Sequence, residues 1–307
     1  MTPERSPFHA GELEAQRRAG VGDGVSGRYI RDYMPDQHRA FFETLPFLVV
    51  AGGDAEGRLW LTMVEGPPGF VRSPDPRTLS IAASVPAHDP LTAALSAEAG
   101  IGILGIDLST RRRNRANGVI RAAEGALVID VRQSFGNCPR HIHVRAWRFA
   151  EPTRAAAART SHRLDAAQQA RVAAADTLFI GSGYRAGGDR PSDGYDASHR
   201  GGSRGFVRAA SDGTRLRIPD YAGNNYFNTV GNLLRDPRVA LLLVDFETGG
   251  LLHIAGRASV DWAPEDCHDP NARRVIEVTV EKVVDRPAAL TLRWRDEASA
   301  AQLAAAS

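Results

Sequence analysis

The sequence contains two copies of one pattern, and this repeat constrains the fold more than any other feature. Three pairs of segments match at nearly constant offsets of 136, 138 and 138 positions. Self-similarity at one long period indicates a repeated structural unit. The chain is therefore predicted to be a tandem duplication. The matching pairs are Gly69–Arg72 with Gly205–Arg208 (both GFVR), Leu104–Thr110 with Leu242–Thr248, and Gly118 with Gly256.

From residue 47 onward the chain is a series of short apolar runs separated by turn residues. Phe47–Ala51, Ile101–Leu108 and Val239–Phe246 are each long enough for a buried strand and too short for a capped helix. Few helical segments separate these runs, which favours antiparallel barrels over a βαβ sheet. The predicted fold class is mainly β (α+β), with duplicated antiparallel Greek-key barrels and short flanking helices.

Helix signals divide the chain further. Asp36–Thr44 follows Pro35, a residue tolerated at the start of a helix, and Glu12–Ala19 is another short candidate. An Ala/Arg-rich run of high helix propensity is predicted to link the two copies. The expected segments are an N-terminal helical part (1–46), a first, structural copy (47–150), the linking helix (151–175), a second, ligand-bearing copy (176–297) and a flexible tail (298–307).

Composition and charge narrow the class of function. The 307 residues carry a formal charge of +2, so no nucleic-acid or membrane partner is expected. No apolar run is long enough to span a membrane, and the N-terminus lacks the apolar region of a secretory signal. Cys138 and Cys267 are too few for a disulfide framework. We expect a cytoplasmic protein that acts on a small molecule.

A polar segment in the second copy is the best candidate for a ligand site. Tyr221–Asn232 lies between β-prone runs and contains four asparagines and a threonine. Asp236-Pro237 ends the short helix predicted after it, because proline disfavours the α conformation in the preceding residue. Asparagine is also common in turns for its local hydrogen bonds alone. A capped turn is therefore the alternative to ligand contact.

Several motifs between about residues 176 and 260 occur in a distinctive order. They are Ser198–Gly202 (SHRGG), Gly205–Arg208 (GFVR), Ile218–Tyr221 (IPDY), Gly223–Asn225 (GNN), Asn228-Thr229 and Asp236-Pro237. Together they resemble the FMN-binding split-barrel family of pyridoxamine 5'-phosphate oxidase, in its oxidase-related branch rather than the true oxidase. The resemblance implies split barrels and an FMN at the seam between two of them. It also implies a pseudo-dimer within the chain or a homodimer.

The same resemblance implies residues that hold the cofactor. The segment from Arg204 to Arg208 would lie along the flavin, while the Asn-rich loop would lie near the phosphate at the start of the short helix. An additional arginine would contribute positive charge there. The implied set is Arg204, Gly205, Phe206, Val207, Arg208, Arg217, Asn224, Asn225, Asn228 and Thr229, with no metal ligand.

Ser198, His199 and Arg200 are the candidate catalytic residues. They precede Gly201-Gly202, and glycines allow a backbone to approach a ligand closely. His199 is the candidate for proton handling or for holding a substrate against the flavin. The alternative is a histidine in a surface loop. No third group is identifiable for a hydrolase triad.

Two polar motifs lie in the first copy. Arg111–Arg115 is the densest charge run, interpreted either as a solvated hairpin tip or as a site for an anionic substrate or second phosphate. Asn137–His143 is predicted to enter a strand, with His141 and His143 on one face. Because further ligands at suitable spacing are lacking, no metal site is expected there.

The sequence thus favours an FMN-dependent oxidoreductase that transfers a hydride or electrons between the flavin and a small-molecule substrate. NADPH or NADH would be the reductant, and the chain shows no nicotinamide-binding motif of its own. Two alternatives remain at this point. One is a flavin-binding or sensing protein without catalysis, and the other is a split barrel that uses heme or a deazaflavin.

Overall fold

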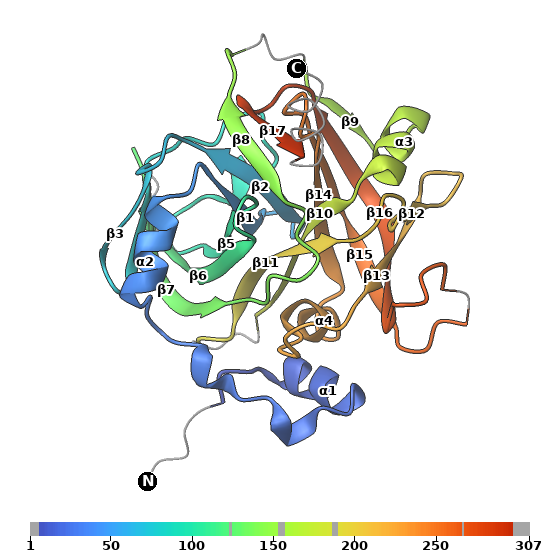
Figure 1. Ribbon diagram of the computed structural model, residues 1–307, viewed down its shortest axis with the longest axis horizontal. Coiled ribbons are helices and arrows are strands. Elements are labelled where there is room, and N and C mark those ends of the chain that lie inside the picture. The colour runs from blue at the N-terminus through green and yellow to red at the C-terminus, as the bar shows by residue number, and fades with distance from the viewer. Residues whose placement is uncertain (1–5, 123–124, 153–156, 186–189, 266, 297–307) are drawn as a thin grey trace, which may run out of the picture.

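The computed structural model describes residues 6–122, 125–152, 157–185, 190–265 and 267–296. Antiparallel strands are the main secondary structure, as predicted, and two large sheets dominate the fold (Figure 1). No helix in the described ranges is long and apolar enough to cross a membrane. The tail predicted to be flexible, 298–307, lies outside the described residues.

The first sheet contains seven strands in the order β2-β1-β5-β6-β7-β4-β3, and every neighbouring pair is antiparallel. Its strands are β1 (Phe47–Gly53), β2 (Leu59–Glu65), β3 (Val71–Asp75), β4 (Thr78–Ile81), β5 (Gly100–Asp107), β6 (Arg112–Ala122) and β7 (Leu127–Gly136).

The second sheet repeats this order, with each strand number nine higher: β11-β10-β14-β15-β16-β13-β12. A further short strand, β9 (Arg159–Ser161), pairs with β16. The main strands are β10 (Thr177–Tyr184), β11 (Gly194–Gly201), β12 (Arg208–Ala209), β13 (Arg215–Asp220), β14 (Arg238–Val244), β15 (Leu251–Asp261) and β16 (Arg274–Arg286).

Gly118 and Gly256, which match in the sequence, also occupy corresponding places in the two sheets. The register of β6 against β7 shifts at Gly118, and that of β15 against β16 shifts at Gly256. A Cβ atom at Gly118 would lie 2.0 Å from the carbonyl oxygen of Asp130, and one at Gly256 would lie 2.1 Å from that of Thr279. Both bulges therefore require glycine, because any side chain would collide with the neighbouring backbone.

The sheets curve but do not close into the predicted barrels. In the described chain the end strands β2 and β3 do not pair with each other, and neither do β11 and β12. The edge strands β2 and β11 instead pack against the opposite sheet, β2 against β14 and β15 and β11 against β5 and β6. Contact between the halves thus takes the place of barrel closure.

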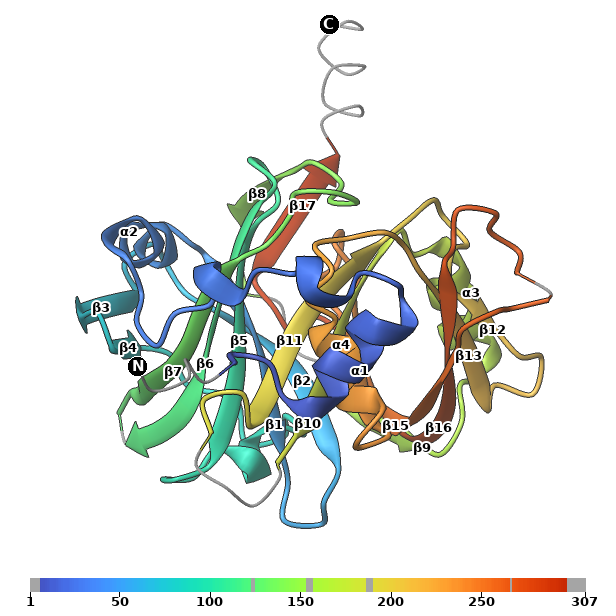
Figure 2. The ribbon, with the colours of Figure 1, turned by 90° about the horizontal axis from the view of Figure 1, so that it is seen from below.

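The helices are short and lie at the ends of the sheets. The helix predicted at Asp36–Thr44 is confirmed as α2 (Asp36–Glu43), with Pro35 as its N-cap, and the first candidate is α1 (Ala10–Arg18). The linker predicted to be helical over 151–175 contains strand β9 and only a nine-residue helix, α3 (Ala166–Ala174). A fourth helix, α4 (Asn228–Leu233), lies against α1 in both views (Figures 1 and 2).

An apolar seam holds the two sheets together. Along β1, Leu48 and Val50 face the core of the first half, whereas Phe47 and Val49 face the seam. They meet Phe179 of β10 in one buried cluster with Leu242 and Trp294, among others. Successive side chains of a strand point to opposite faces, so a central strand that is buried on both faces must be apolar throughout. A two-stranded sheet of β8 (Arg145–Phe149) and β17 (Leu292–Asp296) also joins the halves.

A buried ion pair crosses the same boundary. The Arg286 guanidinium at the end of β16 donates to the carboxylate of Asp89, which follows β4 in the first half. Asp89 also accepts hydrogen bonds from the Thr62 hydroxyl at 2.5 Å and the Leu91 amide at 2.9 Å. Both charged side chains are buried, so each depends on the other for compensation.

The substitution Asp89→Asn is expected to lower the free energy of unfolding by about 3–5 kcal/mol, because it leaves the Arg286 charge buried without a partner. Urea denaturation followed by circular dichroism measures this loss. The matched control is Asp32→Asn, which removes one member of the exposed Arg77–Asp32 pair and should leave the curve unchanged. Equal losses in the two variants would contradict the structural role of the buried pair.

Candidate functional site

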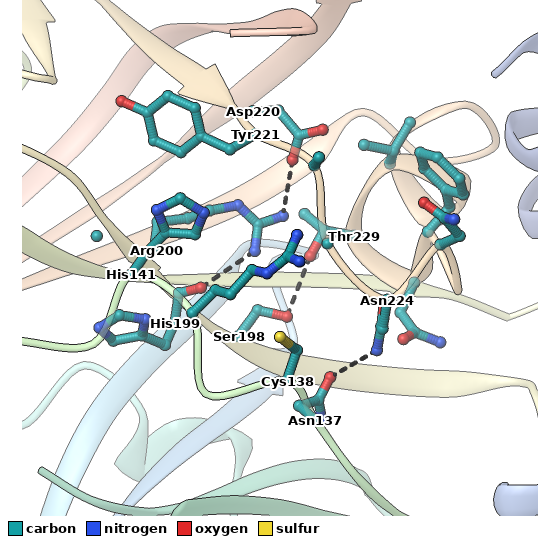
Figure 3. A pocket seen from close by; sticks show the side chains of 18 of the residues that line it. Asn137, Cys138, His141, Ser198, His199, Arg200, Asp220, Tyr221, Asn224 and Thr229 are labelled. Carbon is teal, nitrogen blue, oxygen red and sulfur yellow. Dashed lines mark hydrogen bonds and ion pairs between the residues drawn. The ribbon is translucent and has the colours of Figure 1, made fainter. Parts of the chain in front are cut away.

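A pocket lies at the seam, where strands from both halves meet. The first half contributes β6 and the loop after β7, and the second contributes β11, the end of β13 and the segment 221–230. Its enclosed volume is about 110 Å³. Figure 3 shows the side chains converging on this space from the separate strands.

Five arginines line the pocket: Arg113, Arg115, Arg140, Arg200 and Arg274. The only lining carboxylate among the described residues is Asp220. Its Oδ2 accepts from Nε of Arg274 at 2.9 Å, and its Oδ1 lies 3.5 Å from Arg200 (Figure 3). One carboxylate therefore compensates two of the five guanidinium groups, and the pocket carries excess positive charge.

Arg113 and Arg115 have no carboxylate within ion-pair distance in the described chain. Burial, followed by repulsion from Arg115 and Arg200, lowers the pKa of Arg113 to about 9. Burial also lowers the pKa of Arg115 to about 10, a shift that Asp196 opposes and Arg200 reinforces. Arginine stays protonated in proteins, so the lowered pKa values mean that the charged guanidinium groups are destabilised where they are. A bound anion would relieve this destabilisation.

Arg115 is held by neutral partners. Its guanidinium donates to the carbonyl of Ala197 at 2.9 Å, to Oδ1 of Asn137 and Oδ1 of Asn228 at 3.1 Å each, and to the Ser198 hydroxyl. The Ser198 hydroxyl also lies 3.1 Å from that of Thr229 (Figure 3). Three predicted site residues, Ser198, Asn228 and Thr229, are thus brought together around an arginine from the other half of the chain.

His199 is buried on β11 with 4% of its surface exposed, so its interpretation as a surface-loop residue is wrong. Burial, followed by the charges of Arg113 and Arg200, holds its pKa well below the usual 6.5. Its Nδ1 lies 3.3 Å from a guanidinium nitrogen of Arg113, which can only donate. The proton of the neutral ring is therefore on Nε2, which is buried and has no hydrogen-bond partner.

The loop walls of the pocket have unusual backbone conformations. Asn225, Phe227 and His141 have φ angles of 62°, 61° and 63°, in the left-handed region that non-glycine residues rarely occupy. The His141 ring stacks on Tyr221 at 4.9 Å, and the Asn224 amide donates to Asn137 at 3.0 Å. Residues 137–143 lead into β8, which begins at Arg145, but they are not themselves a strand, so the prediction that His141 and His143 share a strand face is wrong.

Six of the residues assigned to the cofactor by the resemblance lie outside this pocket. Phe206 and Val207 belong to the core of the second half, and Gly205 forms a turn with φ 82°. Arg208 and Arg217 face each other across β12 and β13 beside a separate cavity of about 710 Å³, where Arg217 pairs with Glu277 at 3.1 Å. Arg204 lines a third groove near Trp294. By contrast, Ser198, His199, Arg200, Asn224, Asn225, Asn228 and Thr229 all line the pocket.

Sequence reasoning left two interpretations open for the arginines of β6, a solvated hairpin tip and an anion site, and it missed several other lining residues. The interpretation of Arg111–Arg115 as a solvated hairpin tip holds only for the first two residues. Arg111 and Arg112 are exposed, whereas Arg115 is buried. The match between the two parts of the sequence could have indicated that Arg113 and Arg115 are not on the surface. An offset of 138 aligns Arg113 and Arg115 with Leu251 and His253, which are both buried in the second half. The missed residues are Asn137, Cys138, Arg140, His141, Asp220 and Arg274.

The pocket fits a phosphate group better than a flavin ring. Buried nitrogens without hydrogen-bond partners belong to Arg113, Arg200, Asn137 and His199, and all of these residues line the space. A cavity of about 110 Å³ is smaller than the roughly 300–1,000 Å³ of ligand pockets. It admits the phosphate, whereas the rings of a flavin would extend through the open mouth. No group of three or more metal-ligating side chains is present in the described part of the chain.

No protein-family model and no curated protein matches this chain. Solved structures similar to parts of it include a protein proposed to be a pyridoxamine 5'-phosphate oxidase from Lactobacillus delbrueckii, with 16% identity, 40% of this chain and 94% of that chain covered, and a TM-score of 0.29. An FMN-binding protein from Syntrophomonas wolfei has 11% identity, 38% and 83% coverage, and a TM-score of 0.28. A FAD-binding protein from Mesorhizobium loti has 12% identity, 42% and 97% coverage, and a TM-score of 0.26. At these scores, neither the fold nor the ligand of this chain is inferred from them.

His199 is expected to make folding stability depend on pH. Because its pKa in the folded protein lies well below 6.5, the unfolded chain binds more protons in acid, and stability falls as the pH drops below 6.5. His199→Gln should reduce this slope by up to about 1.4 kcal/mol per pH unit. Urea denaturation between pH 5 and pH 7 measures the slope.

Phe179→Leu is the matched control, since Phe179 packs edge-on against the His199 ring at 5.8 Å without titrating. This variant should lose stability equally at every pH and keep the wild-type slope. A His199→Gln slope identical to that of the wild type would show that His199 has the same pKa in the folded and unfolded protein.

Proposed function

We propose that this chain binds FMN at the seam between its two halves, with the phosphate held in the arginine pocket. The observation that carries the proposal is the charge balance of the pocket, in which five arginines line the space with one carboxylate, Asp220. A dianionic phosphate would compensate the guanidinium groups of Arg113 and Arg115, and such charge-assisted hydrogen bonds are among the strongest in proteins.

The roles of the lining residues follow from their positions. Arg113 and Arg200 each have a buried Nε without a partner, so both can donate to phosphate oxygens. His199 can donate its Nε2–H to a phosphate oxygen in the same region. The neutral ring already carries this proton, so the ring need not be protonated further near neutral pH. The stacked pair of His141 and Tyr221 supplies a flat wall at the mouth, where the flavin rings would lie.

We further propose that the halves are a tandem duplication, so that the seam is that of a pseudo-dimer within one chain. The common strand order and the bulge glycines, Gly118 and Gly256, support this. The matching position on the other side of the seam has no uncompensated charge for a ligand. Thr62 occupies there the place of Ser198, and its hydroxyl donates to Asp89. The carboxylate of Asp89 already pairs with Arg286. One ligand per chain is therefore expected.

The activity we propose is that of an oxidoreductase acting on a small molecule, with NADPH or NADH as reductant. Bound FMN would supply the hydride or electron transfer, and the protein would supply position and electrostatics. The second candidate is a flavin-binding protein without catalysis.

Replacing Arg113 tests the proposed phosphate site. Arg113→Gln should weaken FMN binding by about 10- to 100-fold, the usual loss for a hydrogen bond to a charged group. Quenching of flavin fluorescence during titration measures the affinity. The control is Arg208→Gln, because Arg208 is exposed on β12 and lines a different cavity. The structure predicts no change for this control.

The pair of variants separates two locations for the flavin. A loss confined to Arg208→Gln would place the ligand along residues 204–208 and refute the arginine pocket. A wild-type protein that binds no FMN even in excess would refute FMN as the ligand. Bleaching of the bound-flavin spectrum by NADPH or NADH would distinguish the oxidoreductase from the non-catalytic protein.

A further inference from the structure

The N-terminal helix α1 packs directly on α4, which borders the pocket. The two helices cross at glycines: a Cβ at Gly11 would lie 2.2 Å from the carbonyl oxygen of Gly231, and one at Gly231 would lie 2.6 Å from Cα of Glu12. This close approach buries the polar side chains of α1 that face α4, including His9 and Glu12. A short, polar helix would normally expose them, so their burial calls for an explanation.

The buried polar groups form a continuous chain from α1 into the pocket. Oε1 of Glu12 accepts from the Asn228 amide at 2.5 Å, and Oε2 accepts from the His9 backbone N–H at 2.8 Å. The other end of the Asn228 amide, Oδ1, accepts from Arg115 at 3.1 Å. Asn228 thus uses both ends of its side chain, and the carboxyl of Glu12 fixes which end faces the arginine.

We propose that Glu12 is a positioning residue of the arginine pocket, orienting Arg115 through Asn228, and that anion binding in the pocket is coupled to the protonation of this buried carboxyl. The inference rests on the anion-binding function proposed above. It extends the site to α1, whose Glu12 is more than 100 residues from Arg115 in sequence and 216 residues from Asn228.

The coupling follows from the charges that surround Glu12. Arg115 on β6 and Asp196 on β11 are the charged groups facing it from other elements, and His9 of its own helix lies 3.6 Å from Oε2. Burial, reinforced by Asp196, raises the pKa of Glu12 to about 8. His9 stays neutral, because burial lowers its pKa.

A bound anion and the Glu12 carboxylate would both interact with Arg115, and this determines whether anion affinity rises or falls with pH. An anion in the pocket adds negative charge near Glu12 and therefore favours its protonated form. Binding takes up protons, and affinity is highest below the pKa of Glu12 in the free protein. As the pH rises above about 8, affinity is expected to fall, by at most about tenfold per pH unit for one linked proton.

Sulfate is the appropriate probe because its charge does not change in this pH range. Isothermal titration calorimetry of the full-length protein, from pH 7 to pH 9.5 and in two buffers of different ionisation enthalpy, gives the affinity and the number of protons taken up. The wild type should take up a fraction of one proton near pH 8. No uptake by the wild type would overturn the coupling without any need for a variant.

Three variants complete the test. Glu12→Ala should weaken sulfate binding at pH 7 by about three- to tenfold, whereas Glu12→Gln, which retains an acceptor for Asn228, should restore it while abolishing the proton uptake. Glu14→Gln is the control, since Glu14 pairs with Arg17 and Arg18 on the exposed face of the same helix. It should behave like the wild type.

The outcomes separate this inference from the proposed function. Wild-type proton uptake that persists in Glu12→Gln, or equal binding by Glu12→Ala and the wild type, would refute the role of Glu12. If sulfate binding depends on Glu12 but the protein does not bind FMN, only the proposal that FMN is the ligand is refuted. Absence of sulfate binding would refute the arginine pocket and this inference together.

Discussion

The apolar seam between the two sheets is the contact on which the rest of the structure depends. Strands β1 and β10 bury one face in their own half and the other against the opposite half. Neither sheet closes on itself, so each relies on the other to cover its inner strands. The pocket exists only because of this packing, since Arg115 comes from one sheet and Ser198, its hydrogen-bond partner, from the other.

Each of the two matching positions across the seam contains a buried guanidinium group, but the groups are compensated differently. A buried guanidinium needs a negative partner, because the loss of hydration is otherwise uncompensated. At one position the chain supplies that partner itself, and Asp89 pairs with Arg286. At the other, Arg113 and Arg115 hydrogen-bond to neutral groups and form no ion pair among the described residues. An internal ion pair stabilises the first position, and the second is left with charge that a ligand can satisfy.

The site also draws on an element that local sequence gives little reason to include. Helix α1 has the composition of an ordinary surface helix, yet His9, Glu12 and Gln16 are all buried. They are buried because glycines at the crossing with α4 bring the two backbones close together. Polar groups in such a contact must be fully hydrogen-bonded, and a satisfied polar network specifies one arrangement of its members. This is how a helix at the start of the chain fixes the geometry of a loop near residue 228.

The sequence by itself determined the local elements: the buried strands β1, β5 and β14, predicted at 47–51, 101–108 and 239–246, helix α2 behind Pro35, and the Asn-rich segment, which lines the arginine pocket. These follow from apolar periodicity and turn chemistry, which act within a few residues. Tertiary structure alone decided that Arg113 and Arg115 face the pocket, that Arg208 and Arg217 do not, and that the loop after β7 is not a strand. Alternation along a strand shows which residues share a face, but which face meets the other half depends on contacts more than 80 residues apart in sequence, such as Arg115 with Ser198.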